Sequence, residues 1–266
     1  MSRRVLSVIL VVTLAAVFCV AFQVSSLAAT VLKVGATPVP HAEVLRVVQP
    51  LLAKQGIELR IIEFTDYVQP NLALASGDLD ANYFQHIPYL EQFSADHRLN
   101  LTYTAKVHIE PMAVFSAKHK NLADLKRGAQ IAIPNDPTNG GRALLLLESA
   151  GLIKLASGVG LTATPFDIVS NPLNLRIVEL EAAQLPRSLS DVDAAVINGN
   201  YALEAGLSVL RDALFIETAD SPYVNVLAVR KGDTNPALDK LAEVLASQEV
   251  KDFILKTYNG AVVPAF

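Results

Sequence analysis

An alternation of short apolar strands with helices, starting at residue 31, constrains the fold of this chain more than any other feature. The pattern predicts strands at 32–37, 58–64 and 80–84, with helices at 44–52 and 71–76 between them. Because a crossover between parallel strands is right-handed and usually contains a helix, this order indicates a parallel sheet with helices on both faces. Ligands bind such sheets at the carboxyl ends of the strands.

A second unit with the same alternation follows. Its predicted elements, and a last strand that leads back toward the first unit, are at 130–134, 140–150 (a helix), 175–181, 194–198, 214–218 and 224–230. No Gly/Ser-rich or charged linker divides the chain, so we expect two α/β lobes connected by strands. We place the first lobe at residues 30–112 and 224–266 and the second at 113–223, each with a mostly parallel sheet flanked by helices. A small ligand would bind in the cleft between the lobes and induce closure.

Residues 1–29 have the pattern of a secretory signal peptide. Arg3 and Arg4 precede an apolar run at 5–22, and small residues follow, which predicts cleavage after Ala28 or nearby. The alternative is an uncleaved anchor, because an apolar run of this length is just long enough to span a bilayer.

The only cysteine, Cys19, lies inside that apolar run. A lipoprotein signal has Leu and small residues just before its cysteine, whereas Ala16, Val17 and Phe18 stand here. We therefore expect no lipid anchor and a soluble periplasmic form. The mature chain then has neither a disulfide nor a thiolate. A net charge of −4, with no basic run beyond Arg3 and Arg4, excludes nucleic acid as an expected partner.

Aromatic residues are concentrated between residues 64 and 93. Six of the 7 Tyr and 10 Phe of the chain fall there, and they are Phe64, Tyr67, Tyr83, Phe84, Tyr89 and Phe93. Polar side chains such as Asn82 and His86 stand among them. This mixture indicates a ligand slot with apolar walls and polar tips. The alternative is a patch of core with two hydrogen-bonded tyrosines.

Arg142 stands out in the segment 134–151. Thr138 or Asn139 is expected to cap a helix there, which would place Arg142 in the first turn, where a cation opposes the helix dipole. A bound anion would reverse that effect, so the guanidinium and the helix amides predict a seat for a carboxylate. The alternatives are a solvated arginine or one paired with Asp136.

Two asparagines complete the polar candidates. Asn198 ends a predicted strand, and Asn225 lies at the start of the predicted strand 224–230. An amide side chain offers both donors and an acceptor, which suits an α-amino acid. Asparagine is also common in turns, so a structural role stays open for each.

The sequence gives little support for catalysis or for a cofactor. It contains no nucleophile elbow, no paired metalloprotease histidines and no cysteine nucleophile. His108 and Glu110, with His41 or His86, are the candidate metal ligands, but their spacing matches no recognised zinc motif. We expect a binding protein with no cofactor and no metal.

Seven blocks together resemble the MetQ/NlpA family of methionine-binding proteins. They are ATPVPHAE, FTDYVQPN, DANYFQHIPYL, IPNDPTNGGRALLLL, LEAAQLPRSL, AVINGNYA and DSPYVN. The resemblance covers about residues 31–266. It implies a two-lobe, type 2-like periplasmic binding protein fold without enzymatic activity. It also implies that the protein is the monomeric substrate-binding component of an ABC importer, with L-methionine, an inner-membrane permease and the ATPase subunit of that permease as its partners.

The resemblance also implies roles for individual residues. The family's aromatic cage falls on Tyr67, Phe84 and Tyr89, with His86 beside it. Its carboxylate-binding arginine falls on Arg142, and its polar contacts on Asn198 and Asn225. Thr37, Asn139 and Tyr223 are expected to support these residues.

Methionine suits the chemistry of these residues. Its thioether is apolar and polarizable, and each contact of sulfur with an aromatic ring contributes roughly 0.3–1.5 kcal/mol. The alternatives are D-methionine or a methionyl dipeptide as the ligand, or a metal-capturing protein that uses His86, His108 and Glu110.

Overall fold

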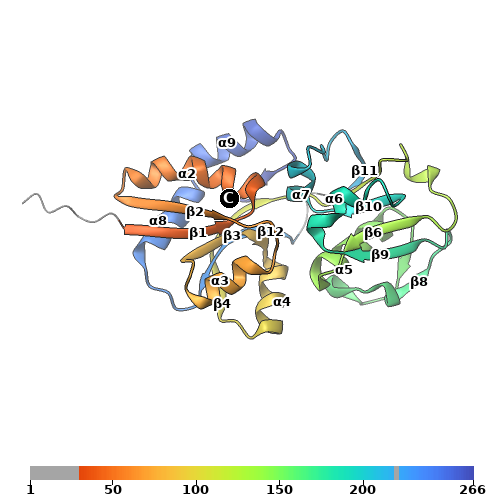
Figure 1. Cartoon of the computed structure of the whole chain (residues 1–266), viewed down its shortest axis with the longest axis horizontal. Coiled ribbons are helices and arrows are strands. Elements are labelled where there is room, and N and C mark those ends of the chain that lie inside the picture. The colour runs from red at the N-terminus through yellow and green to blue at the C-terminus, as the bar shows by residue number, and fades with distance from the viewer. Residues whose placement is uncertain (1–29, 219–221) are drawn as a thin grey trace, which may run out of the picture.

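The computed structural model describes residues 30–218 and 222–266, and these residues form two α/β lobes side by side (Figure 1). A six-stranded sheet of order β13-β4-β12-β3-β1-β2 is the centre of the first lobe, and a five-stranded sheet of order β11-β5-β10-β6-β9 is the centre of the second. The predicted two-lobe α/β fold is confirmed. The predicted signal peptide 1–29, with Cys19, lies outside the described residues.

The first sheet combines parallel and antiparallel strands. Its strands are β1 (Thr30–Ala36), β2 (Ile57–Glu63), β3 (Ala81–His86), β4 (Leu101–Ile109), β12 (Val224–Arg230) and β13 (Val263–Pro264). β1 pairs in parallel with β2 and β3, and these three strands are the ones expected from the alternation. β12 lies antiparallel between β3 and β4, and β13 pairs antiparallel with β4.

The second sheet is mixed in the same way. Its strands are β5 (Ala113–Phe115), β6 (Gln130–Pro134), β9 (Arg176–Leu180), β10 (Ala194–Ile197) and β11 (Ala213–Ile216). β6 pairs in parallel with β9 and β10, whereas β5 pairs antiparallel with β10 and β11. β7 (Lys154–Leu155) and β8 (Ile168–Ser170) form a separate small ladder.

The prediction that both sheets are mostly parallel is therefore wrong in its detail. The chain changes sheet between Ile109 and Ala113 and again between Ile216 and Val224. A strand before or after such a change has no crossover helix that would make it parallel to its neighbour in the sheet. It can therefore pair antiparallel. The exact lobe limits at 112/113 and 223/224 stay a prediction.

Helices cover both faces of the first sheet, with α2, α8 and α9 packed together and α3 and α4 on the opposite side (Figure 1). The helices are α2 (Glu43–Ala53), α3 (Gln69–Ser76), α4 (Ile87–His97), α5 (Pro137–Ser149), α6 (Leu185–Ser188), α7 (Gly199–Glu204), α8 (Pro236–Leu245) and α9 (Gln248–Tyr258). Short helical turns are η1 (Pro38–Ala42), η2 (Leu122–Asp124), η3 (Gly160–Thr162), η4 (Pro165–Asp167) and η5 (Ala182–Gln184).

Helix α4 is absent from the sequence-based prediction. It begins directly after β3, where the imidazole of His86 accepts a hydrogen bond from the backbone N–H of Tyr89 and so caps the helix. Pro88 lies in the first turn, which suits its fixed φ. Aromatic side chains dominate this segment and hide its helical periodicity. The helix matters because its first turn places Tyr89 beside the end of β3.

The two lobes share part of one hydrophobic core. Leu32 and Leu227 of the first sheet belong to the same cluster as Ala195 and Ile197 of the second, and Tyr201 of α7 joins them. α7 therefore packs at the boundary between the lobes, where Figure 1 also places it. The residues that precede and begin α7 are consequently held against both lobes.

Candidate functional site

The three residues predicted to form an aromatic cage lie together. The ring centroid of Tyr67 is 5.9 Å from that of Phe84 and 5.8 Å from that of Tyr89, and Phe84 and Tyr89 are 6.1 Å apart. These distances are typical of interacting aromatic pairs. The residues come from the loop after β2, the end of β3 and the first turn of α4. Because β2 and β3 both run parallel to β1, their carboxyl ends lie at the same edge of the sheet, and this brings the three residues together.

Two residues of α7 that the sequence analysis did not single out complete this cluster from the second lobe. The Tyr201 ring lies 4.9 Å from that of Tyr67. The Tyr67 hydroxyl donates a hydrogen bond of 2.6 Å to Asn200 Oδ1. Both residues stand in the block AVINGNYA, which was the available signal. Burial raises the pKa of the Tyr67 phenol well above its ordinary value, so this group is a neutral donor.

A cleft of about 420 Å³ opens beside the cluster. Tyr67 and Tyr89 line it from the first lobe, and Asp136, Glu181 and Tyr201 line it from the second. The aromatic cluster therefore borders a space between the lobes, as expected for a ligand slot.

His86 is buried at the end of β3 and is neutral. Its Nδ1 accepts from Tyr89 N (3.1 Å), so Nε2 carries the proton and donates to Asn139 Oδ1 (3.1 Å). Burial, with a smaller contribution from Arg142, lowers the pKa of His86 to about 3. A neutral imidazole here is a fixed hydrogen-bond donor directed at the second lobe.

Asn139 joins His86 to Asn198. Its Oδ1 also accepts from Asn198 Nδ2 at 2.7 Å, and its Nδ2 donates to both carboxylate oxygens of Asp136 at 3.0 Å. Asp136, rather than Thr138 or Asn139, is the N-cap of α5, because its Oδ1 accepts from Asn139 N at 2.9 Å. The prediction of the cap was thus wrong by two or three residues, since Pro137 starts the helix earlier than expected.

Arg142 is buried and paired. Its Nε donates to Glu217 Oε1 (2.9 Å), its Nη2 donates to Glu217 Oε2 and to the Glu110 carbonyl oxygen (2.8 Å), and its Cζ lies 4.0 Å from the Tyr223 ring centroid. Both alternatives for Arg142, a solvated side chain and a pair with Asp136, are wrong. Since α5 begins at Pro137, Arg142 lies in the second turn, and the argument from the first-turn dipole does not apply.

The structure therefore shows how Arg142 holds a carboxylate, and the carboxylate is that of Glu217. Within the described residues, the hydrogen bonds of this five-donor group engage Nε and Nη2.

Asn225 lies at the start of β12, opposite His86 on β3 and His108 on β4. Its Oδ1 is 3.1 Å from His41 Nε2. Asn225 thus lies beside His86 in the first sheet, and its side chain also contacts a second polar cluster that contains His41.

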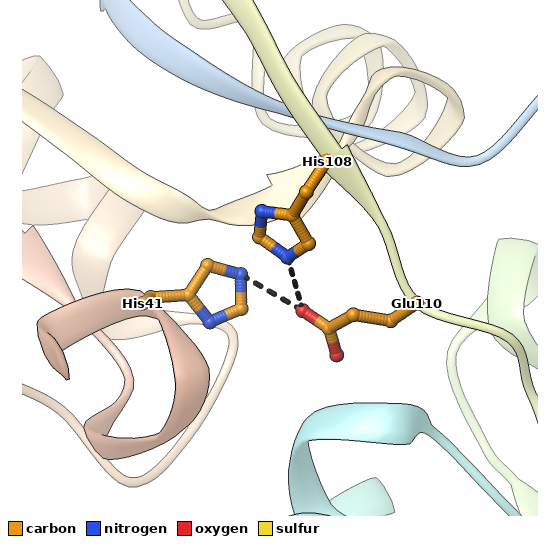
Figure 2. Close-up of side chains that lie close together, drawn as sticks. All are labelled: His41, His108 and Glu110. Atoms are coloured by element: carbon orange, nitrogen blue, oxygen red, sulfur yellow. Dashed lines mark hydrogen bonds and ion pairs between the residues drawn. The ribbon is translucent and has the colours of Figure 1, made fainter. Parts of the chain in front are cut away.

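That second cluster consists of His41, His108 and Glu110 (Figure 2). Glu110 Oε1 lies 2.7 Å from His108 Nε2 and 3.3 Å from His41 Nε2. All three side chains are buried, and their ligand atoms lie within 4.8 Å of one another. Of the two predicted sets of candidate metal ligands, the one with His41 comes together, whereas the one with His86 does not, because His86 faces Asn139 instead.

Two buried polar atoms at the start of α7 have no hydrogen-bond partner within the described part of the chain. They are Asn198 Oδ1, an acceptor, and Asn200 Nδ2, a donor. Buried polar groups are nearly always hydrogen-bonded, so such a pair requires an explanation. A zwitterionic ligand would supply both a donor and an acceptor.

The two lobes, the aromatic cluster between them and the polar groups around Arg142 define a solute-binding protein of the two-lobe periplasmic type. The chain belongs to the NlpA lipoprotein family, whose sequence model matches residues 32–266. Members of this family serve as substrate-binding proteins.

Three similar proteins illustrate the family. The chain is 47% identical over 236 residues to the D-methionine-binding lipoprotein MetQ of Salmonella typhimurium, covering 87% of each chain. A nutrient-binding protein from Burkholderia cenocepacia, whose structure was solved bound to methionine, is 50% identical with a TM-score of 0.86, covering 88% of this chain and 100% of that one. The crystal structure of the methionine-binding protein MetQ is 44% identical with a TM-score of 0.85, covering 89% and 98%.

Within residues 30–218 and 222–266, no helix has both the length and the apolar character needed to cross a membrane.

Proposed function

We propose that this protein captures L-methionine between its lobes and delivers it to an inner-membrane ABC permease with its ATPase subunit. The observation that carries the proposal is the aromatic cluster of Tyr67, Phe84 and Tyr89 next to Asn198 Oδ1 and Asn200 Nδ2, two buried atoms without a partner among residues 30–218 and 222–266. The methionine found in the Burkholderia structure, at 50% identity, supports the same ligand.

The proposal assigns the thioether to the aromatic cluster. Rings at centroid separations near 6 Å offer several faces and edges to a sulfur atom without demanding a polar partner. The amino-acid end lies toward Arg142, His86, Asn198 and Asn225, where Arg142 Nη1 binds the carboxylate and Asn198 Oδ1 accepts from the ammonium. No catalytic step and no cofactor is part of this function.

The lobes, proposed as 30–112 with 224–266 and 113–223, close over the ligand. The protein acts as an exported monomer. The relatives are named lipoproteins, which weighs against our prediction of a form without a lipid. The intact mass of the protein from its host tests this point: loss of about residues 1–28 without an acyl mass is expected, and an acyl group on Cys19 would overturn the soluble form.

The ligand is tested by thermal unfolding of residues 30–266, denatured and refolded first to remove any bound ligand. A ligand at 100 times its dissociation constant adds about 2.7 kcal/mol to stability, a readily measured shift. We expect a large shift with L-methionine and little with alanine. D-methionine, the ligand for which the Salmonella relative is named, and a methionyl dipeptide are compared in parallel. A larger shift with either would move the assignment to that ligand, and no shift with any of them would end the proposal.

A further inference from the structure

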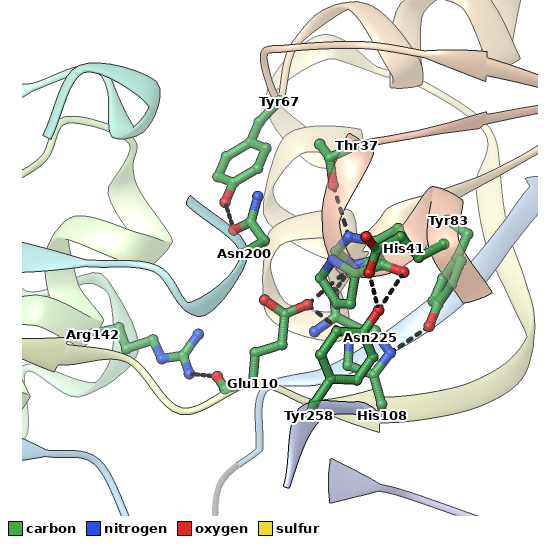
Figure 3. A network of polar contacts seen from close by, with 12 residues as sticks. Thr37, His41, Tyr67, Tyr83, His108, Glu110, Arg142, Asn200, Asn225 and Tyr258 are labelled. Carbon is green, nitrogen blue, oxygen red and sulfur yellow. Dashed lines mark hydrogen bonds and ion pairs between the residues drawn. The ribbon is translucent and has the colours of Figure 1, made fainter. Parts of the chain in front are cut away.

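Glu110 lies where the chain passes from the first lobe to the second, between β4 and β5, and its side chain is buried. Figure 3 shows it at the centre of a polar network that reaches both lobes. Contacts of its side chain and of its backbone lead to three of the residues proposed to bind methionine, although Glu110 itself was predicted only as a metal ligand.

The side chain of Glu110 is held by two histidines of the first lobe. The Tyr83 hydroxyl bonds His108 Nδ1, and Thr37 Oγ1 lies 2.7 Å from His41 Nδ1. When these hydroxyls donate, each imidazole keeps its proton on Nε2. His108 donates this proton to Glu110 Oε1 at 2.7 Å, whereas His41 donates its proton to Asn225 Oδ1 and lies 3.3 Å from Glu110 Oε1. Burial lowers the pKa of His41 to about 4 and that of His108 to about 3, which agrees with neutral rings.

From this centre, contacts lead to the proposed ligand-binding residues. His41 Nε2 lies 3.1 Å from Asn225 Oδ1 as well. The backbone carbonyl of Glu110 accepts from Arg142 Nη2 at 2.8 Å. Burial raises the pKa of the Glu110 carboxyl, and the backbone of Asn200, in the first turn of α7, acts on that pKa in the opposite sense.

Gly199 explains how α7 comes so close. A Cβ at this position would lie 2.8 Å from Glu110 Cβ and 3.2 Å from Glu110 Oε2. Real Cβ atoms do not approach other carbon atoms so closely, so only glycine allows α7 to rest on Glu110. Asn198, the N-cap of α7, takes its position from this contact.

We propose that Glu110 is a positioning residue that holds Arg142, Asn198 and Asn225 in one ligand-binding arrangement across the two lobes. This inference rests on the proposed function, since it assigns the support of that same site. Glu110 itself does not touch the ligand.

A metal site is the competing use of the same side chains. Two imidazoles and a carboxylate are a known zinc donor set, and hydroxyls on both Nδ1 atoms resemble the outer hydrogen bonds of such sites. A metal would need both Nε2 atoms unprotonated, whereas the contacts described above use both as donors. Each Nε2 proton already has an acceptor in this network without a metal ion, which favours a positioning role for Glu110.

The test uses Glu110→Gln and Gly199→Ala in the mature chain, with Glu179→Gln on an exposed position of β9 as the matched control. Glu110→Gln removes the charge and turns one acceptor into a donor. Gly199→Ala removes no polar group and only pushes α7 away from Glu110. Calorimetric titrations compare L-methionine with its carboxamide, which lacks the carboxylate.

We expect both variants to bind methionine at least about tenfold more weakly than the wild type and the control. We also expect a smaller preference for methionine over the carboxamide, because a displaced Arg142 no longer selects the carboxylate. A purely structural role would weaken both ligands in proportion and leave this preference unchanged. Methionine affinities within about twofold of the wild type in both variants would overturn the proposal.

Two further measurements separate the other outcomes. The NMR signal of Arg142 Nε–H reports its position without any ligand, so it should shift in both variants even if the wild type fails to bind methionine and the proposed function is lost. An unchanged signal would overturn the positioning role. Stoichiometric Zn²⁺ binding to the wild type that disappears in Glu110→Gln would also overturn it, in favour of a metal site.

Discussion

Tyr67 and Asn200 form a hydrogen bond of 2.6 Å that joins the two lobes. Tyr67 follows β2 of the first sheet, and Asn200 lies in α7, which follows β10 of the second. The bond therefore requires the lobes to be close together. It also uses the acceptor of Asn200 and leaves its Nδ2 without a partner among the described residues.

Replacing Tyr67 by Phe should weaken methionine binding about fivefold. The ring remains, but the variant loses a hydrogen bond worth about 1 kcal/mol and leaves Asn200 Oδ1 without its donor. Titration calorimetry measures the change, with Tyr103→Phe on the partly exposed Tyr103 of β4 as the control. Equal affinities in wild type and Tyr67→Phe would show that the inter-lobe bond does not contribute to the bound state.

Removing the whole ring in Tyr67→Ala should reduce affinity for methionine more than affinity for alanine. The ring contributes contacts to the thioether, and alanine has no side chain that reaches it. The ratio of the two dissociation constants is the measurement. Losses of the same factor for both ligands would contradict an aromatic slot for the thioether.

Arg142→Ala should abolish measurable methionine binding, a loss of about 100-fold or more, because charge-assisted hydrogen bonds to the carboxylate are lost. The variant also leaves Glu217 without its partner, so we expect a lower unfolding temperature with an unchanged circular dichroism spectrum. Arg211→Ala, whose side chain is 76% exposed, is the control. Micromolar affinity retained in Arg142→Ala would refute the carboxylate assignment.

Acidification should destabilise the fold through its buried histidines. Burial lowers the pKa of His41 to about 4 and that of His86 and His108 to about 3, from 6.5, so the unfolded chain binds more protons below pH 6.5. Their contribution is complete above pH 6.5 and is lost as the pH falls toward 4. Burial raises the pKa of Glu110 and Asp136, and these two carboxyl groups act in the opposite sense.

With three histidines against two carboxyl groups, we expect a net loss on acidification, with each histidine contributing up to about 1.4 kcal/mol per pH unit. Urea unfolding at about pH 6.5 and about pH 5 measures this loss of stability. His86→Gln should lower by one the number of extra protons that the unfolded state binds, and so reduce the slope of the unfolding free energy against pH. An unfolding free energy that stays constant or rises toward pH 5 would contradict neutral histidines.

Local patterns predicted most of the fold. The strands β1, β2 and β3 and the end of α3 follow from apolar spacing and from residues such as Gly77, whose φ of 87° ends α3. The antiparallel insertion of β12 did not follow, because it depends on a contact between segments more than 100 residues apart. α4 did not follow either, since its aromatic side chains obscure the periodicity.

The same distinction applies to the site. The candidate residues Tyr67, Phe84 and His86 lie near the ends of predicted strands, and the concentration of aromatic residues and the family resemblance pointed to them and to Tyr89. The partners of Arg142 and Tyr67 could not be predicted. Glu217 is 75 residues from Arg142, and Asn200 is 133 residues from Tyr67. Such pairs depend on how the lobes meet, which no local pattern records.

The position of β12 also sets an order for the folding of the chain during its synthesis. β12 lies between β3 and β4, so the first sheet cannot be assembled before residue 230 has been made. The second lobe, by contrast, is built from one continuous stretch that is complete earlier. A growing chain that stops before β12 carries a finished second lobe and an unfinished first one, and only the full-length chain can bring the two halves of the cleft together.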